Sequence, residues 1–174
     1  MFVTALSLLL ALASAQDSQR PLHLDVAYQP TPPAVVEAML EFAHVQGGDV
    51  LYDLGSGDGR IPIAAAKRYG IRAVGVELDP DLVHEARQNA RSQGVSHLVE
   101  FRQEDLFKVS LADATVVTLY LGSELNARLR PRLLRELRPG TRIVSHRFDM
   151  AGWPPEKTRE VSGRSIYLWT VRPH

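Results

Sequence analysis

An acidic residue followed by glycines at alternate positions is the stretch of this sequence best suited to chemistry. Residues 50–60 read Val-Leu-Tyr-Asp-Leu-Gly-Ser-Gly-Asp-Gly-Arg, an apolar run that ends at Asp53 and then breaks into glycines. The run is β-rich and too short for a helix, whereas residues 61–69 have helical composition. Glycines between a buried strand and a helix let the backbone approach a ligand closely. The stretch therefore predicts a cofactor-binding elbow, whose candidate cofactor-binding residues are Asp53, Gly55, Gly57 and Gly59.

The spacing within this elbow indicates the class of ligand. A nicotinamide-dinucleotide site uses the pattern G-x-G-x-x-G, with the pyrophosphate at a helix N-terminus. This sequence has D-x-G-x-G-x-G instead, and Asp53 would repel a phosphate but attract an amino group. S-adenosylmethionine carries an ammonium at its amino-acid end and a cationic sulfonium, so it is the expected cofactor. The alternative for this stretch alone is a surface turn rich in glycine and aspartate.

Two further carboxylates follow the next two predicted strands. Residues 72–77 form an apolar run that ends at Glu77, close to where a nucleotide-binding unit places a carboxylate for ribose hydroxyls. A third strand over residues 98–102 is followed by Asp105, which is placed to accept a hydrogen bond from the adenine amino group. A lone acid of this kind is usually a solvated loop residue. Acids after three successive strands indicate one ligand site.

The acceptor side of the site is expected after a fourth strand. Residues 114–121 are almost continuously apolar with β-branching, which fits a central position in a parallel sheet. Open α/β sheets bind their ligands beyond the carboxyl ends of the strands. A fifth strand is expected over residues 141–147. The candidate catalytic residues, with orienting roles, are Tyr120, Ser123, Glu124 and His146. For each of them a purely structural role is the alternative.

Helical segments alternate with these strands. A helix over residues 33–44 follows Thr31, a residue able to cap it. Its sheet-facing residues are Val35, Met39 and Phe42. Another helix opens at Pro80 and stops at Gly94. Its sheet-facing residues are Leu82, Val83, Ala86 and Ala90.

The end of the chain predicts a hairpin, which completes the fold. Two alternating segments, 158–161 and 165–171, flank the dipeptide Gly163-Arg164, which is typical of a turn. Alternating strands and helices through five strands, finished by such a hairpin, predict an α/β fold. We expect a Rossmann-like, doubly wound sheet of seven strands, mostly parallel with a C-terminal antiparallel hairpin.

Composition bounds the function. The 174 residues, 45% hydrophobic and 23% charged, suffice for one α/β domain, expected over residues 28–174. Twenty Lys and Arg balance twenty Asp and Glu, so no overall field draws the chain to nucleic acid or an anionic membrane. The absence of cysteine excludes disulfides and thiolate metal sites, and the six histidines have no metal-ligand spacing. The expectation is a monomer without a metal or a nucleic-acid partner.

Five arginines follow the fourth strand. In the helix expected there, Leu125, Leu129 and Leu133 face the core. A solvated basic face is the expectation for the arginines, and a dedicated site for an acidic partner is the alternative. They are Arg128, Arg130, Arg132, Arg135 and Arg138.

The first fifteen residues differ in character from the rest. Residues 2–13 are nearly all apolar, and Ala13-Ser14-Ala15 has the small-x-small pattern of a secretory cleavage site. The run is too short to span a bilayer comfortably, and it has no preceding Lys or Arg. Residues 1–15 are expected to be a signal peptide and residues 16–27 a linker, which makes the protein exported, either periplasmic or secreted. A cytoplasmic protein is the alternative.

The successive motifs resemble those of class I, seven-β-strand S-adenosylmethionine-dependent methyltransferases. The resemblance rests on residues 53–60, Glu77 and Glu104-Asp105-Leu106. A narrower resemblance is to the seven-strand protein-lysine methyltransferases. These include the broad-specificity archaeal enzymes and the family that methylates a lysine of the ATP synthase c subunit. The narrower resemblance is carried by residues 28–32, 53–60, 74–77 and 145–148.

The resemblance implies methyl transfer from S-adenosylmethionine to lysine side chains of proteins. The Asn/Asp-Pro-Pro-Tyr motif of many amino-methylating enzymes is absent, because Leu-Tyr-Leu-Gly-Ser stands at residues 119–123. A small-molecule N- or O-methyltransferase and an exported S-adenosylmethionine-binding protein without transferase activity are the alternatives. By resemblance the cofactor is lined by Tyr28, Thr31, Asp53, Gly55, Glu77, Asp105 and Leu106.

Overall fold

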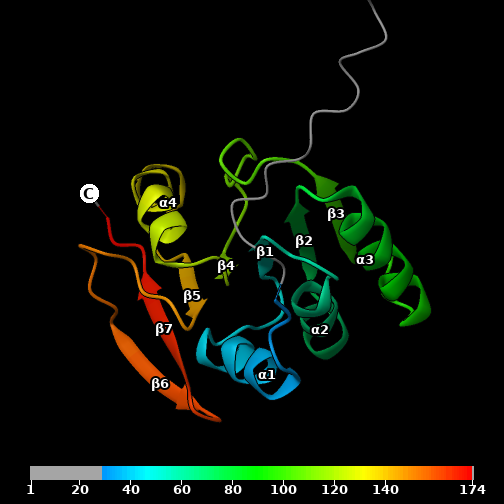
Figure 1. Cartoon of the computed structure of the whole chain (residues 1–174), viewed down its shortest axis with the longest axis horizontal. Coiled ribbons are helices and arrows are strands. Elements are labelled where there is room, and N and C mark those ends of the chain that lie inside the picture. Colours follow the sequence, from blue (N-terminus) through cyan, green and yellow to red (C-terminus); the bar gives the residue numbers. More distant parts are fainter. Residues whose placement is uncertain (1–28, 174) are drawn as a thin grey trace, which may run out of the picture.

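The computed structural model describes residues 29–173. Tyr28, the expected signal peptide 1–15 and the expected linker 16–27 lie outside the described residues. One mixed sheet runs through the described chain (Figure 1), in the strand order β3-β2-β1-β4-β5-β7-β6. Five neighbouring strands are parallel, and the last two pair antiparallel at one edge. The predicted doubly wound, seven-stranded α/β fold is confirmed. The strands are β1 (Val50–Leu54), β2 (Arg72–Glu77), β3 (Val99–Gln103), β4 (Val116–Leu119), β5 (Arg142–His146), β6 (Lys157–Val161) and β7 (Arg164–Thr170).

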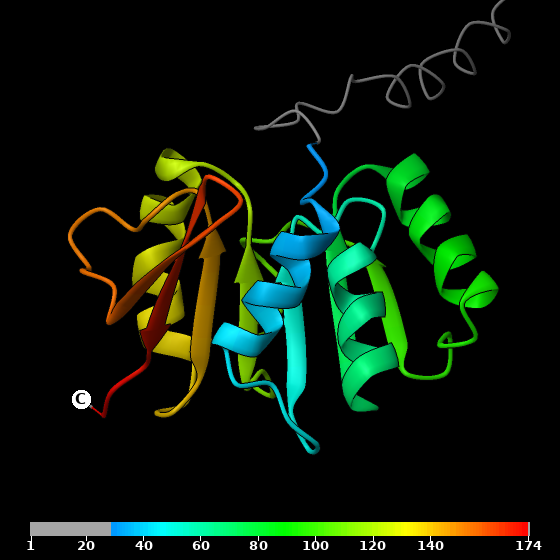
Figure 2. The same ribbon diagram turned by 90° about the horizontal axis from the view of Figure 1, so that it is seen from below.

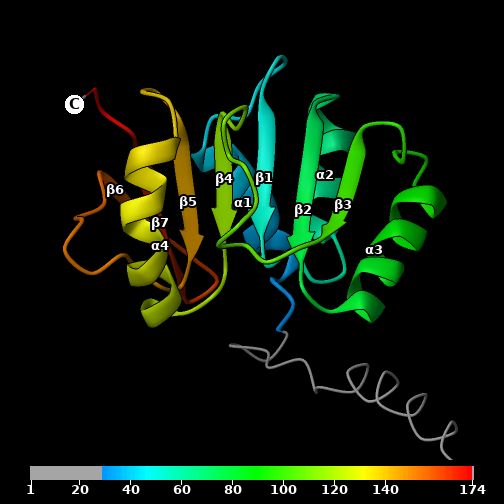
Figure 3. The same cartoon turned by 90° about the horizontal axis from the view of Figure 1, so that it is seen from above.

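Helices cover both faces of the sheet because side chains alternate along each strand. Leu51 of β1 belongs to the core layer under the first three helices, whereas its neighbour Tyr52 belongs to the layer under the fourth. Val144 and Ile143 of β5 divide between the two layers in the same way. Figures 2 and 3 show the two faces in turn. The helices are α1 (Pro33–Phe42), α2 (Arg60–Tyr69), α3 (Pro80–Ser92) and α4 (Ser123–Glu136).

Helix α1 begins at Pro33 as predicted, but its C-terminal end and its cap differ from the prediction. It ends at Phe42 because His44 adopts a left-handed conformation, φ 50°, and the Val45 N–H returns to the Leu40 carbonyl at 3.1 Å. At the other end Pro32 takes the cap position, and no side chain caps the helix. The prediction that Thr31 caps it is wrong, because its hydroxyl instead meets the His146 ring nitrogen Nδ1 at 3.2 Å. The sheet-facing residues are buried as predicted: Val35, Met39 and Phe42.

The C-terminal hairpin turns one residue earlier than predicted. Its central residues are Ser162 and Gly163, with φ values of 51° and 71°, and Arg164 is already the first residue of β7. Val161 pairs directly with Arg164, so two residues with positive φ connect the strands. A two-residue turn of this kind matches the right-handed twist of the flanking strands.

The carboxyl ends of the parallel strands meet at one edge of the sheet. The turn between β6 and β7 and the chain that enters α1 reach the same edge (Figures 2 and 3). Residues far apart in sequence are thereby brought together where open α/β sheets bind ligands. Within residues 29–173, no helix combines the length and apolarity needed to cross a bilayer.

Candidate functional site

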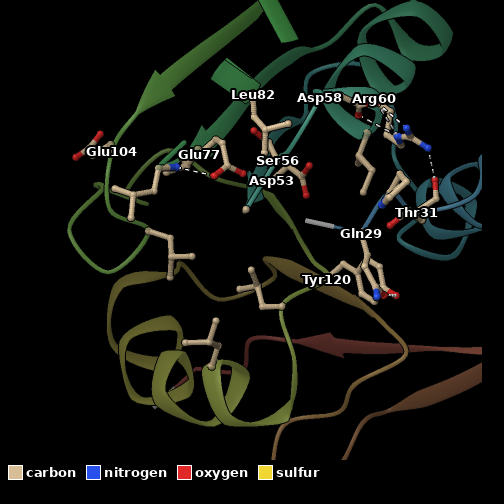
Figure 4. A pocket seen from close by; sticks show the side chains of 18 of the residues that line it. Gln29, Thr31, Asp53, Ser56, Asp58, Arg60, Glu77, Leu82, Glu104 and Tyr120 are labelled. Carbon is tan, nitrogen blue, oxygen red and sulfur yellow. Dashed lines mark hydrogen bonds and ion pairs between the residues drawn. The ribbon is translucent and has the colours of Figure 1, made fainter. Parts of the chain in front are cut away.

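A cavity opens at the carboxyl edge of the sheet, between the ends of β1, β2 and β4 and the loop after β3 (Figure 4). It brings together most of the residues predicted for the cofactor. These are Thr31, Asp53, Gly55, Glu77, Asp105 and Leu106. Of the predicted catalytic residues, Tyr120 lines the same cavity.

Asp53 is the buried acid at the floor of this cavity. Its side chain accepts a hydrogen bond of 2.7 Å from the Thr118 hydroxyl on the neighbouring strand β4. Burial raises the pKa of the Asp53 carboxyl to about 7; the Thr118 bond opposes the rise, and the charges of Glu77 and Asp58 add to it. A cation that approaches Asp53 favours the carboxylate and lowers the pKa of this group.

The three glycines of the elbow have different roles. Gly55 lines the cavity, and a Cβ there would lie 2.5 Å from the Leu121 side chain. Gly57 and Gly59 do not line it. The Gly57 N–H donates to Glu77, and Gly59, with φ 81°, turns the chain into α2. Two of the three glycines predicted to contact the cofactor therefore shape the loop.

Ser56, between the glycines, lines the cavity and was not predicted. It is 5% exposed, and its hydroxyl has no hydrogen-bond partner among residues 29–173. Buried hydroxyls are normally paired, so this one is an exception. It lies against Gly75, where a Cβ would come within 2.7 Å of the Ser56 oxygen. The only feature of the sequence that could have indicated Ser56 as a cavity residue is its position between the glycines of the elbow.

Arg60 ties the entering chain to the glycine loop. Its guanidinium forms an ion pair with Asp58 at 2.6 Å and donates to the Thr31 carbonyl at 3.0 Å. Asp58 and Arg60 both line the cavity, although neither was predicted for it. Figure 4 shows this chain of contacts on one side of the cavity.

Glu77 organises the backbone around the second strand end. One carboxylate oxygen accepts from the N–H groups of Leu78 and Asp79 at 2.8 and 3.0 Å, and the other accepts from Gly57 at 3.0 Å. A carboxylate has about four acceptor positions, so one remains for a ribose hydroxyl. Glu77 therefore both holds the glycine loop and presents an acceptor to the cavity.

The loop after β3 forms an apolar wall with one polar end. Asp105 accepts a 2.9 Å bond from the Phe107 N–H, and Leu106 and Phe107 line the cavity. Leu82 faces them from α3. The prediction that Leu82 packs on the sheet is wrong, because it is only partly buried and lines the cavity, whereas Val83 is buried.

On the acceptor side, Tyr120 is the predicted residue that reaches the cavity. Its hydroxyl donates to Gln29 at 3.2 Å, and its ring lies 4.0 Å from the His146 ring, centroid to centroid. Ser123 and Glu124 are exposed on the first turn of α4 and do not line the cavity. Their predicted orienting roles have no support in this geometry.

His146 is fully buried beneath Tyr120 rather than exposed to the cavity. Its Nδ1 meets Thr31, and its Nε2 has no partner among the described residues. Burial lowers the pKa of the imidazole to about 4, and the charges of Arg164 and Arg147 act in the same direction. The ring is thus neutral at pH 7 and supports Tyr120 from below.

The residues of the cavity fit S-adenosylmethionine. Asp53 supplies a carboxylate for the ammonium. Glu77 has acceptor capacity for the ribose. Leu82, Leu106 and Phe107 offer apolar surface to a purine ring, and Asp105 stands beside them.

Cofactor affinity is expected to rise with pH between 5.5 and 7.5. Binding a cationic amino-acid end favours the Asp53 carboxylate, so the proton held on the free protein below its pKa of about 7 must leave. The dissociation constant of S-adenosylhomocysteine, which carries the same ammonium, should fall roughly 25-fold over this range. Calorimetric titration in buffers of different ionisation enthalpy would detect the released proton. In Asp53→Asn both the pH dependence and the proton release should vanish.

Arg132 of α4 braces the loop after β3. Its side chain is 11% exposed, donates to the carbonyls of Leu106 and Val109, and pairs with Glu136. The expectation of a solvated face is wrong for this arginine, because the loop lies against its helix. We expect Arg132→Gln to weaken S-adenosylhomocysteine binding roughly three- to tenfold through a loosened Asp105 loop. Calorimetry would measure this loss, and exposed Arg138→Gln should show none.

Comparison with known proteins places this geometry in a family. Residues 53–157 match the family model described as the ANTKMT methyltransferase domain. A protein-lysine N-methyltransferase of Saccharolobus islandicus (strain REY15A) is 42% identical over 154 residues, covering 86% of this chain and 96% of that protein. The adenine nucleotide translocase lysine N-methyltransferase of Mus musculus is 41% identical over 136 residues. That match covers 78% of this chain but only 58% of the mouse protein.

A solved structure matches both fold and sequence. The crystal structure of an RNA methyltransferase from Salinibacter ruber, in complex with S-adenosyl-L-homocysteine, superposes with a TM-score of 0.83 and is 55% identical. The match covers 84% of this chain and 95% of that one. These similarities confirm the resemblance and the cofactor inferred from the motifs. The chain belongs to the ANTKMT-type family of S-adenosylmethionine-dependent methyltransferases.

Proposed function

We propose that this protein methylates lysine side chains of other proteins. The observation that carries the proposal is the 42% identity to an archaeal protein-lysine N-methyltransferase over 96% of that enzyme's length. Lysine methyltransferases of animals match over 58 to 63% of their length in two further cases. The site supports the proposal because Tyr120 reaches the cavity from the acceptor side.

The chemistry required of the protein is mostly positioning. When bound, S-adenosylmethionine supplies an electrophilic methyl group. A lysine amine, with an ordinary pKa of about 10.4, must lose its proton before it can attack. Partial desolvation beside Tyr120 and a nearby positive charge both lower the pKa of that amine. Because these effects increase the fraction of neutral amine, no dedicated base is needed. His146, neutral at pH 7, adds no charge beside it.

The residue assignments belong to the same proposal. Asp53 binds the amino-acid end of the cofactor, Glu77 the ribose and Asp105 the adenine. Thr31, Gly55 and Leu106 complete the binding site, as does Tyr28, which lies outside the described residues. Gly57 and Gly59 maintain the loop. Tyr120 orients the acceptor amine, with His146 as a positioning residue beneath it.

Radioactive methyl transfer to a cell extract tests the proposal. Purified protein would be incubated with tritiated S-adenosylmethionine and an extract containing both protein and RNA. Label should resist ribonuclease, disappear with protease, and elute as methyllysine after acid hydrolysis. Asp53→Asn is the control, since it should abolish labelling. Label in no amino acid would contradict the proposal.

RNA methylation is a second candidate function. It is favoured by one observation, the 55% identity to a structure described as an RNA methyltransferase. The balanced charge of the chain argues against it, because RNA-binding surfaces are usually basic. Ribonuclease-sensitive label in the same assay would select this candidate.

We also propose that the domain spans residues 28–174, is monomeric, and is exported after cleavage of residues 1–15. Cleavage between Ala15 and Gln16 would support export, and Edman sequencing of the protein from a periplasmic or culture fraction would detect it. An intact Met1 in the cytoplasm would select the alternative location. Light scattering of the purified full-length protein would measure its mass against the 19.3 kDa of one uncleaved chain.

A further inference from the structure

We propose that Arg147 and Arg164 form a basic rim that binds carboxylates of an acidic protein segment flanking the methylated residue. This inference rests on the proposed function, because it names the class of protein that the acceptor side selects. The two arginines line one surface hollow together with Gly163 and Ser165.

The backbone holds both arginines in fixed positions. Arg147 directly follows β5, adopts a left-handed conformation with φ 68°, and donates its N–H to the Ser165 carbonyl at 2.7 Å. Positive φ is uncommon outside glycine, so this residue is constrained by the end of the ladder. Arg164 follows the tight turn at Ser162 and pairs with Val161. The side chains therefore extend from the ends of two paired strands rather than from a loose loop.

The charges of these two arginines are not compensated within the described chain. Both are exposed, and neither forms an ion pair with a carboxylate among residues 29–173. Two arginines of other strands do form ion pairs: Arg142 with Asp49, and Arg72 with Asp113. Two guanidinium groups in one hollow repel each other, and an anion placed between them relieves that repulsion. The positive charges of Arg147 and Arg164 also act on the buried His146, because both contribute to the lowered pKa of its imidazole.

The hollow lies next to the acceptor side of the cofactor cavity. The Arg147 guanidinium stands 5.7 Å from the centroid of the Phe148 ring. Phe148 stacks with Tyr120 at 6.1 Å, and Tyr120 lines the cavity. One layer of aromatic side chains thus separates the rim from the cavity. When a lysine of a bound protein segment enters the cavity past Tyr120, the residues next to that lysine in the segment lie near Arg147 and Arg164.

Carboxylates suit this rim better than a nucleic-acid backbone. A guanidinium binds a carboxylate through two parallel hydrogen bonds, and two of them can hold two acidic side chains. Single-stranded RNA is usually bound by a longer basic groove with stacking aromatics. The chain has no net charge to supply such a groove. The rim therefore favours a protein segment with Asp or Glu near its target lysine.

Fluorescence anisotropy tests the rim directly on the full chain saturated with S-adenosylhomocysteine. One labelled peptide has a central lysine flanked by glutamates, and its partner has glutamines in their place. Wild type should bind the glutamate peptide about tenfold more tightly, and salt should reduce the difference. In Arg147→Gln/Arg164→Gln the difference should disappear while affinity for S-adenosylhomocysteine is unchanged. The matched control is the double variant Arg138→Gln/Arg159→Gln, which changes two exposed arginines outside the hollow.

The proposal of a basic rim would be overturned if wild type bound the two peptides equally. It would also be overturned if the preference for the glutamate peptide survived in Arg147→Gln/Arg164→Gln. Binding of single-stranded RNA that is lost in the double variant, with no preference between the peptides, would overturn it in favour of nucleic acid. The proposed function fails separately. If the rim selects the glutamate peptide but no lysine acquires label, the rim stands and lysine methylation does not. If lysine is methylated but wild type prefers neither peptide, lysine methylation stands and the rim does not.

Discussion

Asp53→Asn is expected to weaken S-adenosylhomocysteine binding roughly 100-fold, because a buried carboxylate that pairs with a charged ligand contributes several kcal/mol. The Asn side chain has the same shape and can keep the bond to Thr118, but it carries no charge for the ammonium. Calorimetric titration at pH 7.5 measures the change. At this pH most of the wild-type carboxyls are ionised, since their pKa is about 7.

The fold should survive this substitution. Burial disfavours the charged form of Asp53, so the stability of the ligand-free protein falls as the pH rises from about 4 to about 7. A neutral amide removes that cost, and the variant should melt at or above the wild-type temperature at pH 8. Asp113→Asn is the matched control, because Asp113 pairs with Tyr52 and Arg72 outside the cavity. Unchanged affinity in Asp53→Asn would contradict the placement of the ammonium.

Gly59→Ala is expected to destabilise the protein by about 2–5 kcal/mol, the sum of backbone strain and overpacking. Its φ of 81° is unfavourable for a residue with a side chain. A Cβ at this position would lie 2.4 Å from the Phe101 ring and 2.9 Å from the Ala86 side chain. Both neighbours are buried core residues and have little room to move. Urea unfolding measures the change in free energy.

Gly70 provides the matched control at the other end of the same helix. Its φ is 63°, but a Cβ there would meet no atom within 4 Å. Gly70→Ala should therefore cost only about 1–2 kcal/mol, the strain alone. Equal losses for the two variants would show that contact with Phe101 is not what requires glycine at position 59. A larger loss for Gly59→Ala would show that this glycine serves packing rather than close approach of the cofactor.

Two regions of the site differ in how completely the fold forms them. The cofactor side is built from strand ends and their hydrogen bonds, as at Asp53 and Glu77. The acceptor side has Tyr120 over a buried histidine and an exposed pair of arginines beside it. A rigid cofactor site with a more open acceptor edge suits a macromolecular substrate.

Local pattern was sufficient to predict the sheet and its acidic strand ends. Strand β2 has its predicted bounds, and Asp53, Glu77 and Asp105 line one cavity. This succeeds because apolar runs of strand length, broken by glycine or proline, are properties of neighbouring residues. The convergence of the three acids then follows from topology, since the carboxyl ends of parallel strands share one edge.

Contacts between distant segments could not be read from pattern. Thr31 was expected to cap a helix, yet it meets His146, which is 115 positions away. Arg132 was expected in solvent, yet it braces the loop at Leu106. The sequence predicts which residues are polar and where each element runs. Which side chains become buried together, and therefore which pKa values shift and which hydroxyls stay unpaired, depends on packing among elements that only the folded chain brings within a few ångströms.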